Sequence, residues 1–115
     1  MGVTFGMDYT PVQKFKENQG VTAAVAWTPT TSTKIVLTDF YVNTGVSPAG
    51  TFQIRFGNVG GAIIAAGALT GSTGFGFGFE TPVYSGVYDR AIFFETGTGS
   101  STSGWNVTLV GFEQE

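Results

Sequence analysis

The chain has 115 residues, with a formal net charge of −3 and charged residues making up only 11% of the sequence. It contains no cysteine and no histidine, which excludes disulfides, cysteine nucleophiles and a Ser-His-Asp triad. The five basic residues are scattered, which argues against a nucleic-acid surface. No apolar run reaches transmembrane length, so we expect no membrane partner. The length suits one domain.

Residues 1–20 differ in composition from the rest of the chain. Polar and charged side chains dominate, and Phe5, Tyr9 and Phe15 are spaced among them. The segment as a whole shows neither a continuous strand alternation nor a helical stripe. We therefore expect an extended N-terminal arm at 1–20, followed by a single domain at 21–115. The arm is either a frayed terminus or a segment that orders on a neighbouring surface, with the three aromatics as anchors.

Short β-strand patterns recur about every 8 to 12 residues from residue 21 onward. In one of them Phe52, Ile54 and Phe56 alternate with polar residues. The predicted strands cover 21–27, 33–43, 51–56, 62–66, 73–82, 83–88, 89–95 and 105–115. This pattern predicts an all-β, antiparallel sandwich or barrel. About eight short strands in one small domain favour a jelly roll, and another Greek-key sandwich is the alternative.

The long predicted strand at 33–43 is apolar on both faces. By strict alternation, Ile35, Leu37 and Tyr41 share one face with Asp39. The opposite face carries Val36, Phe40 and Val42. One face is therefore expected to meet something other than the domain's own core, unless a loop covers it. Asp39 would need a polar partner among apolar neighbours, and Arg55 on an adjacent strand is a candidate.

The stretch "TGFGFGFETP", residues 73–82, alternates phenylalanine with glycine. The core-facing row is predicted to be Phe75, Phe77 and Phe79. The opposite row is Gly74, Gly76 and Gly78. We expect Pro82 to end this strand, and the bare glycine row to allow another backbone to approach closely, either the arm or a neighbouring subunit. The candidate subunit-contact face comprises these three glycines with Ile35, Leu37 and Tyr41.

Catalytic and binding chemistry is sparse in the sequence. Glu80 and Glu95 lie near predicted strand ends. Most glycosidases use two carboxyl groups as their catalytic residues. No metal-binding or phosphate-binding pattern is present, so we expect no cofactor, no metal and no enzyme activity. Tyr84 and Tyr88 are candidate exposed residues that could stack on a sugar. Trp105 could do the same, but we prefer a core-facing row with Val107 and Leu109.

Several segments resemble one family when taken together. They are "STKIVLTDFYVNTG", "GTFQIRFG" and "GFGFETPVYSGVYDRAIFFETGTGSSTSGWNVTLVGFEQE". The shared features are a long strand ending in Asn43, a Phe-x-Ile-Arg-Phe-Gly strand, a Pro-x-Tyr-x-Gly-x-Tyr-Asp approach to a strand, and a last strand of Val-Thr-Leu-Val-Gly-Phe-Glu type. Residues 33–115 thereby resemble small jelly-roll virion proteins of tailed bacteriophages, of the head decoration (cement), head-fibre or tail-appendage type.

That resemblance implies a structural protein without catalytic residues. It would be made in the host cytoplasm, form a homotrimer and bind the major capsid protein on the virion surface, with its arm against the capsid. Two other functions stay open from the residues. One is a carbohydrate- or receptor-binding module of a phage fibre or tail appendage, and the other is a glycosidase-type enzyme.

Overall fold

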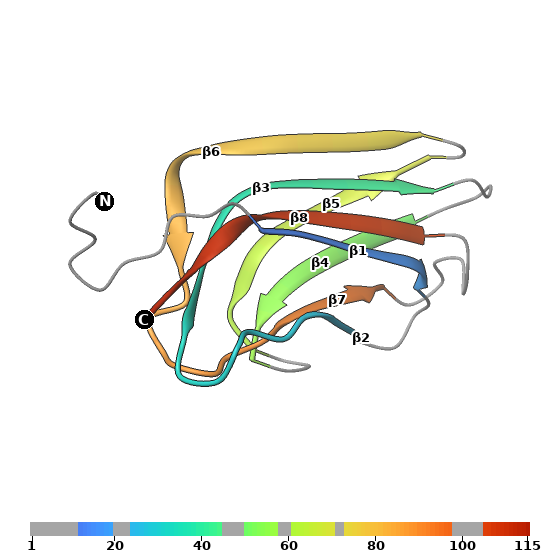
Figure 1. Cartoon of the computed structure of the whole chain (residues 1–115). Coiled ribbons are helices and arrows are strands. Elements are labelled where there is room, and N and C mark those ends of the chain that lie inside the picture. Colours follow the sequence, from blue (N-terminus) through green and yellow to red (C-terminus); the bar gives the residue numbers. More distant parts are fainter. Residues whose placement is uncertain (1–11, 20–23, 45–49, 58–60, 71–72, 98–104) are drawn as a thin grey trace.

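The computed structural model describes residues 12–19, 24–44, 50–57, 61–70, 73–97 and 105–115. Within them, two antiparallel sheets pack face to face (Figure 1). The first sheet has the order β1-β8-β3-β6, and the second has the order β2-β7-β4-β5. The first consists of β1 (Val12–Gln19), β8 (Trp105–Gln114), β3 (Lys34–Thr44) and β6 (Gly74–Tyr84). The second consists of β2 (Ala24–Trp27), β7 (Ile92–Thr96), β4 (Gly50–Phe56) and β5 (Ile63–Leu69).

The connectivity is that of a jelly roll. Strands β1 to β4 alternate between the two sheets, β5 stays beside β4, and β6 to β8 alternate again. Each strand of the first half pairs with one of the second half, namely β1 with β8, β2 with β7, β3 with β6 and β4 with β5. Two interleaved Greek keys require this arrangement. The expected all-β jelly-roll sandwich is therefore confirmed.

Three strands show the alternation that builds the core between the sheets. Buried and partly exposed residues alternate along β4, β7 and β8. Phe52, Phe94 and Trp105 are each at most 1% exposed, and their rings lie 6.0–6.2 Å apart between centroids. Offset and tilted aromatic pairs at such spacing add to the hydrophobic gain from burial. The row Trp105, Val107 and Leu109 faces this core as expected.

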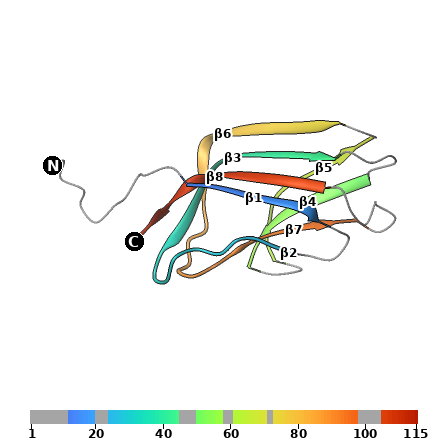
Figure 2. The same cartoon turned by 45° about the vertical axis from the view of Figure 1, so that its right-hand side comes forward.

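The predicted number of strands is right, but the membership differs at two places. Residues 83–88 form no separate strand, because β6 runs through Pro82 to Tyr84. Proline is tolerated there because, among the described strands, β6 is an edge strand with a partner on one side only. The pairing of β3 with β6 changes register between Leu37 and Asp39, which are opposite Val83 and Gly78 respectively. Figures 1 and 2 show the sharp bend of β6 at this level.

The second difference concerns the expected arm. Residues 12–19 are strand β1, which pairs antiparallel with β8 and forms an edge of the first sheet. Assigning all of 1–20 to an arm was therefore wrong for this part. The segment carries Lys14, Lys16 and Glu17, and charged residues are common on edge strands, where they weaken the alternation pattern. Phe15 lies on β1 opposite Thr108, whereas Phe5 and Tyr9 lie outside the described residues.

Candidate interaction surface

Strands β5 and β6 are the edge strands on one long side of the sandwich (Figures 1 and 2). An apolar groove lies between them. Its volume is about 220 Å³. The lining residues are Phe40, Ile64, Ala65, Ala66, Phe75, Phe77 and Phe79. We call this the β5–β6 groove. Large aromatic residues form the β6 wall and small aliphatic residues form most of the β5 wall, so the two walls leave space between them.

The phenylalanine row of β6 faces this groove. Phe79 packs against the core cluster, but Phe75 and Phe77 remain 45% and 49% exposed. Phe40 on β3 contacts all three rings, at centroid distances of 5.8–6.1 Å. The prediction that the three phenylalanines share one inward face is therefore right. The prediction that this face is buried is wrong for Phe75 and Phe77. The reason is that β6 is at the edge of its sheet, opposite alanine residues too small to cover the rings.

Side chains of β3 lie close to the glycine row of β6. A Cβ atom at Gly76 would lie 2.9 Å from Cδ1 of Tyr41, and one at Gly78 would lie 2.8 Å from Oδ2 of Asp39. A Cβ atom at Gly74 would overlap the Tyr41 hydroxyl. The Tyr41 ring thus lies over two of the glycines, as aromatic residues do beside glycines in edge strands. Side chains of the neighbouring strand therefore lie beside the glycines, which remain exposed, and the close approach of another backbone stays a prediction.

A β-bulge at Thr38 changes which residues of β3 face outward. The register shifts by one residue between Leu37 and Asp39 relative to β8, and the Thr38 hydroxyl donates a hydrogen bond of 3.0 Å to the Val110 carbonyl. Ile35 and Leu37 are consequently fully buried. Their assignment to an exposed contact face with Tyr41 was wrong, because strict alternation fails across an inserted residue. Tyr41, which is 46% exposed, keeps the outward orientation.

Tyr84 and Tyr88 are exposed, at 54% and 50%, in agreement with their selection as surface residues. Tyr84 ends β6, and Tyr88 lies in the turn that follows, where Nζ of Lys34 lies 4.7 Å from its ring centroid. Hydrogen bonds from the backbone N–H groups of Ser85 and Asp89 to β3 and its preceding turn hold this segment in place. Tyr84 is therefore presented where β6 ends and Tyr88 from the ordered turn that follows, and neither lines the β5–β6 groove.

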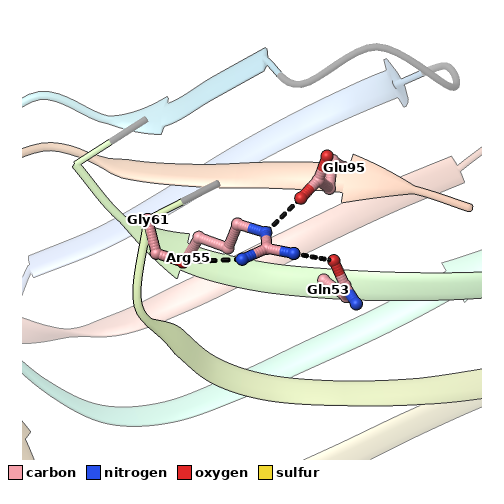
Figure 3. Close-up of polar contacts among 4 residues, drawn as sticks. All are labelled: Gln53, Arg55, Gly61 and Glu95. Atoms are coloured by element: carbon pink, nitrogen blue, oxygen red, sulfur yellow. Dashed lines mark hydrogen bonds and ion pairs between the residues drawn. The ribbon is translucent and has the colours of Figure 1, made fainter. Parts of the chain in front are cut away.

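Arg55 is held by a polar network on the second sheet (Figure 3). Its Nε donates to Glu95 on β7, its Nη1 donates to the Gly61 carbonyl at 2.6 Å, and its Nη2 donates to Gln53 Oε1 at 2.5 Å. The expected pairing with Asp39 is wrong, because Asp39 lies on the other sheet. Glu80 and Glu95, the two carboxylates considered for glycoside hydrolysis, likewise lie on different sheets. The structure brings neither pair together.

A buried tryptophan and a carboxylate link the two sheets near the end of the chain. The indole N–H of Trp27, on β2, donates a 2.9 Å hydrogen bond to Oε2 of Glu113, on β8. Burial alone would raise the pKa of Glu113, but hydrogen bonds from Trp27 and Thr30 and the charge of Lys14 outweigh it and lower the pKa. Glu113 is thereby held as a carboxylate in the folded protein.

The described ranges offer neither a metal cluster nor a membrane-spanning helix. In those ranges no three histidine, cysteine, aspartate or glutamate side chains are grouped to hold a metal ion. Nor does any helix there combine the length and apolar character needed to cross a membrane.

The sequence did not predict the β5 wall of the groove. The run that contains Ile64, Ala65 and Ala66 is short and apolar, which is typical of a buried strand. The structure makes it an edge strand with several half-exposed residues. The signal that could have revealed this is its small side chains, because a strand rich in alanine and glycine cannot cover a row of phenylalanines.

Comparisons with known proteins support the fold and leave the function open. No protein-family model and no curated protein matches the chain. A chain from Bacillus endospore appendages, described as a novel family of disulfide-linked pili, aligns with a TM-score of 0.50 and 15% identity, over 100% of this chain and 98% of that one. A chain from the cyanophage Pam1 capsid asymmetric unit aligns with a TM-score of 0.47 and 13% identity, over 96% and 89% respectively. At these identities the first similarity indicates a common fold alone.

Proposed function

We propose that this chain is a structural virion protein that decorates a phage head as a homo-oligomer, with a trimer as the expected state. The observation that carries the proposal is the open side of the jelly roll. Phe75 and Phe77 are about half exposed beside an edge strand. Adjacent exposed aromatic rings on a sparsely charged surface are typical of a site covered by another protein.

The proposed role is mechanical. Subunits would bridge neighbouring copies of the major capsid protein on the particle surface. They would stabilise the expanded shell, because a protein that binds only the assembled state lowers the free energy of that state. The resemblance of residues 33–115 to decoration proteins motivates this choice of partner. Catalysis has no part in the proposal, and neither does a cofactor.

Two measurements test this function. Light scattering at micromolar concentration should show an oligomer, and the protein should co-sediment saturably with expanded capsids assembled from the major capsid protein of its virus. Bound protein should also raise the temperature at which those capsids rupture. A monomer that fails to co-sediment would overturn the proposal.

The second candidate function is a carbohydrate- or receptor-binding module. It is favoured by the exposed rings of Tyr84, at the end of β6, and Tyr88, in the ordered turn that follows. Tyr84→Ala and Tyr88→Ala should then abolish binding on a glycan array without changing the melting temperature. An array on which the unmodified protein binds nothing removes this candidate.

A further inference from the structure

The N-terminal segment contains a short row that complements the β5–β6 groove. Although alternation does not persist over residues 1–20, it is regular over residues 3–9. The apolar row is Val3, Phe5, Met7 and Tyr9. The intervening residues are Thr4, Gly6 and Asp8. An extended strand would present the four apolar side chains on one face and the small or polar ones on the other.

The edge of β6 offers the place where such a strand fits. In the described part of the chain, β6 pairs with β3 alone, so its other side presents backbone N–H and C=O groups that can accept a further strand. A strand added there continues the first sheet. Its apolar row then extends the row of Phe75 and Phe77 over the β5–β6 groove. Its polar row continues the face that carries Tyr41, which is exposed to solvent.

The same chain cannot supply this strand to itself. The segment joins β1 at Val12, and β1 lies at the opposite edge of the sheet order β1-β8-β3-β6. A strand beyond β6 would be four strand spacings from β1, or about 19 Å. The three peptide units from Tyr9 to Val12 span at most about 11 Å. Residues 3–9 therefore cannot lie along β6 of their own sandwich.

We infer that residues 3–9 of one copy add as a strand to the edge of β6 in a second copy and cover its groove. The contact is heterologous, because the donor segment and the acceptor edge are different surfaces, and successive donations close into a ring where the rotation allows it. The inference rests on the self-association in the proposed function and is independent of the capsid as partner. It also reassigns the anchors Phe5 and Tyr9 from the capsid to a neighbouring subunit.

Cysteine cross-linking between copies tests this arrangement, since the natural chain has no cysteine. Full-length Thr4→Cys or Asp8→Cys protein is mixed with full-length Glu80→Cys protein and treated with a bifunctional maleimide. Because each copy carries a single cysteine, any mixed product joins two copies. Testing both ends of the segment allows for either strand direction. The matched control for Glu80→Cys is Gln13→Cys, which is also exposed but lies on β1, at the other edge of the sheet.

We expect a mixed dimer with Glu80→Cys from at least one of the two segment variants, in at least tenfold excess over the product with Gln13→Cys. Equal yields with both acceptors, or no mixed product, would overturn the inference. Preferential linking of Glu80→Cys protein to itself would also overturn it, because β6 would then pair with a second β6.

A substitution pair supplies an independent readout. Phe5→Asp places a charge in the apolar row and should reduce the solution mass from oligomer to monomer. Thr4→Asp places it in the polar row and should leave the mass unchanged. Equal masses for the two variants would contradict the inference. If the unmodified oligomer still binds capsids in that case, the proposed function stands and only the donated strand is lost. Cross-linking to β6 without capsid binding would instead retain the donated strand and remove the capsid as partner.

Discussion

Strands β8 and β6 both pair with β3 in the same sheet, and both carry a row of large apolar residues at every second position. Along β8, Trp105, Val107 and Leu109 are buried to within 1%. Along β6, Phe75 and Phe77 are about half exposed. The difference lies in what each row faces, since Trp105 packs on Phe52 and Phe94 whereas the β6 row faces alanines across an open edge. Alternation thus indicates the face of a strand, and its neighbours determine how far that face is buried.

The largest effect should come from truncating the β8 row. Trp105→Ala removes a side chain that is 0% exposed, and the cavity left in the core should cost about 3–5 kcal/mol of unfolding free energy. Urea unfolding followed by circular dichroism measures this cost. Tyr84→Ala is the surface control and should change stability by less than about 0.5 kcal/mol. Similar costs for both variants would contradict the assignment of β8 to the core.

Phe77→Ala should have an intermediate effect, because only about half of the ring is removed from water. We expect a cost of about 1–2 kcal/mol, including its contacts with Phe40 and Phe79. Phe94→Ala is the matched control, since the same side chain is there 0% exposed, and it should cost about 3–5 kcal/mol. Urea unfolding of both variants compares the loss of the same side chain from a half-exposed and from a buried position. If Phe77→Ala costs as much as Phe94→Ala, the groove is closed in solution.

The glycine row gives a smaller effect with a characteristic sign. Gly76→Val should destabilise the protein by about 1 kcal/mol, because the new side chain displaces the Tyr41 ring. In a Tyr41→Ala background the same substitution should be stabilising by about 0.5–1 kcal/mol, since valine suits a strand better than glycine. A double-mutant cycle measured by thermal unfolding isolates this coupling. Additive effects would show that Tyr41 does not cover Gly76.

The smallest effect concerns acid stability, at the end of β8. The lowered pKa of Glu113 in the folded state means that its charged form stabilises the protein above the ordinary value of 4.5. That contribution is lost as the pH falls below this value and through the folded-state pKa. Glu113→Gln should therefore lose less stability than the unmodified protein between neutral and acid pH. Thermal melts across this range measure the two slopes, and Glu115→Gln, at an exposed position, is the control.

Much of the fold could be predicted from the sequence because most strands alternate without interruption. The rows of β4 and β8 led directly to the buried faces, and strand spacing led to the jelly roll. Three features escaped for physical reasons. Edge strand β1 carries charges that obscure its period, Pro82 is tolerated because β6 is at an edge, and the inserted Thr38 reverses the outward face of β3.

Less of the candidate site could be predicted. The phenylalanine row and Tyr41 were identified from sequence, but the β5 wall and the contact of Tyr41 with the glycines were not. Both depend on which strands become neighbours across the sandwich and within the sheet. Which strands pair across a long stretch of chain depends on contacts throughout the domain. The residue pattern of a single strand does not determine its partner.

The bulge at Thr38 divides β3 into two parts, in which opposite positions of the alternation face the core. Before the bulge the odd-numbered Ile35 and Leu37 belong to the core cluster, and after it the even-numbered Phe40 and Val42 do. Val36, on the other face before the bulge, is also 0% exposed but lies outside that cluster. Strands β8 and β6 both change register at this same level, so the phase boundary crosses three strands of the sheet. An insertion or deletion of a single residue would therefore be absorbed at this boundary more readily than at any regularly paired position of β3.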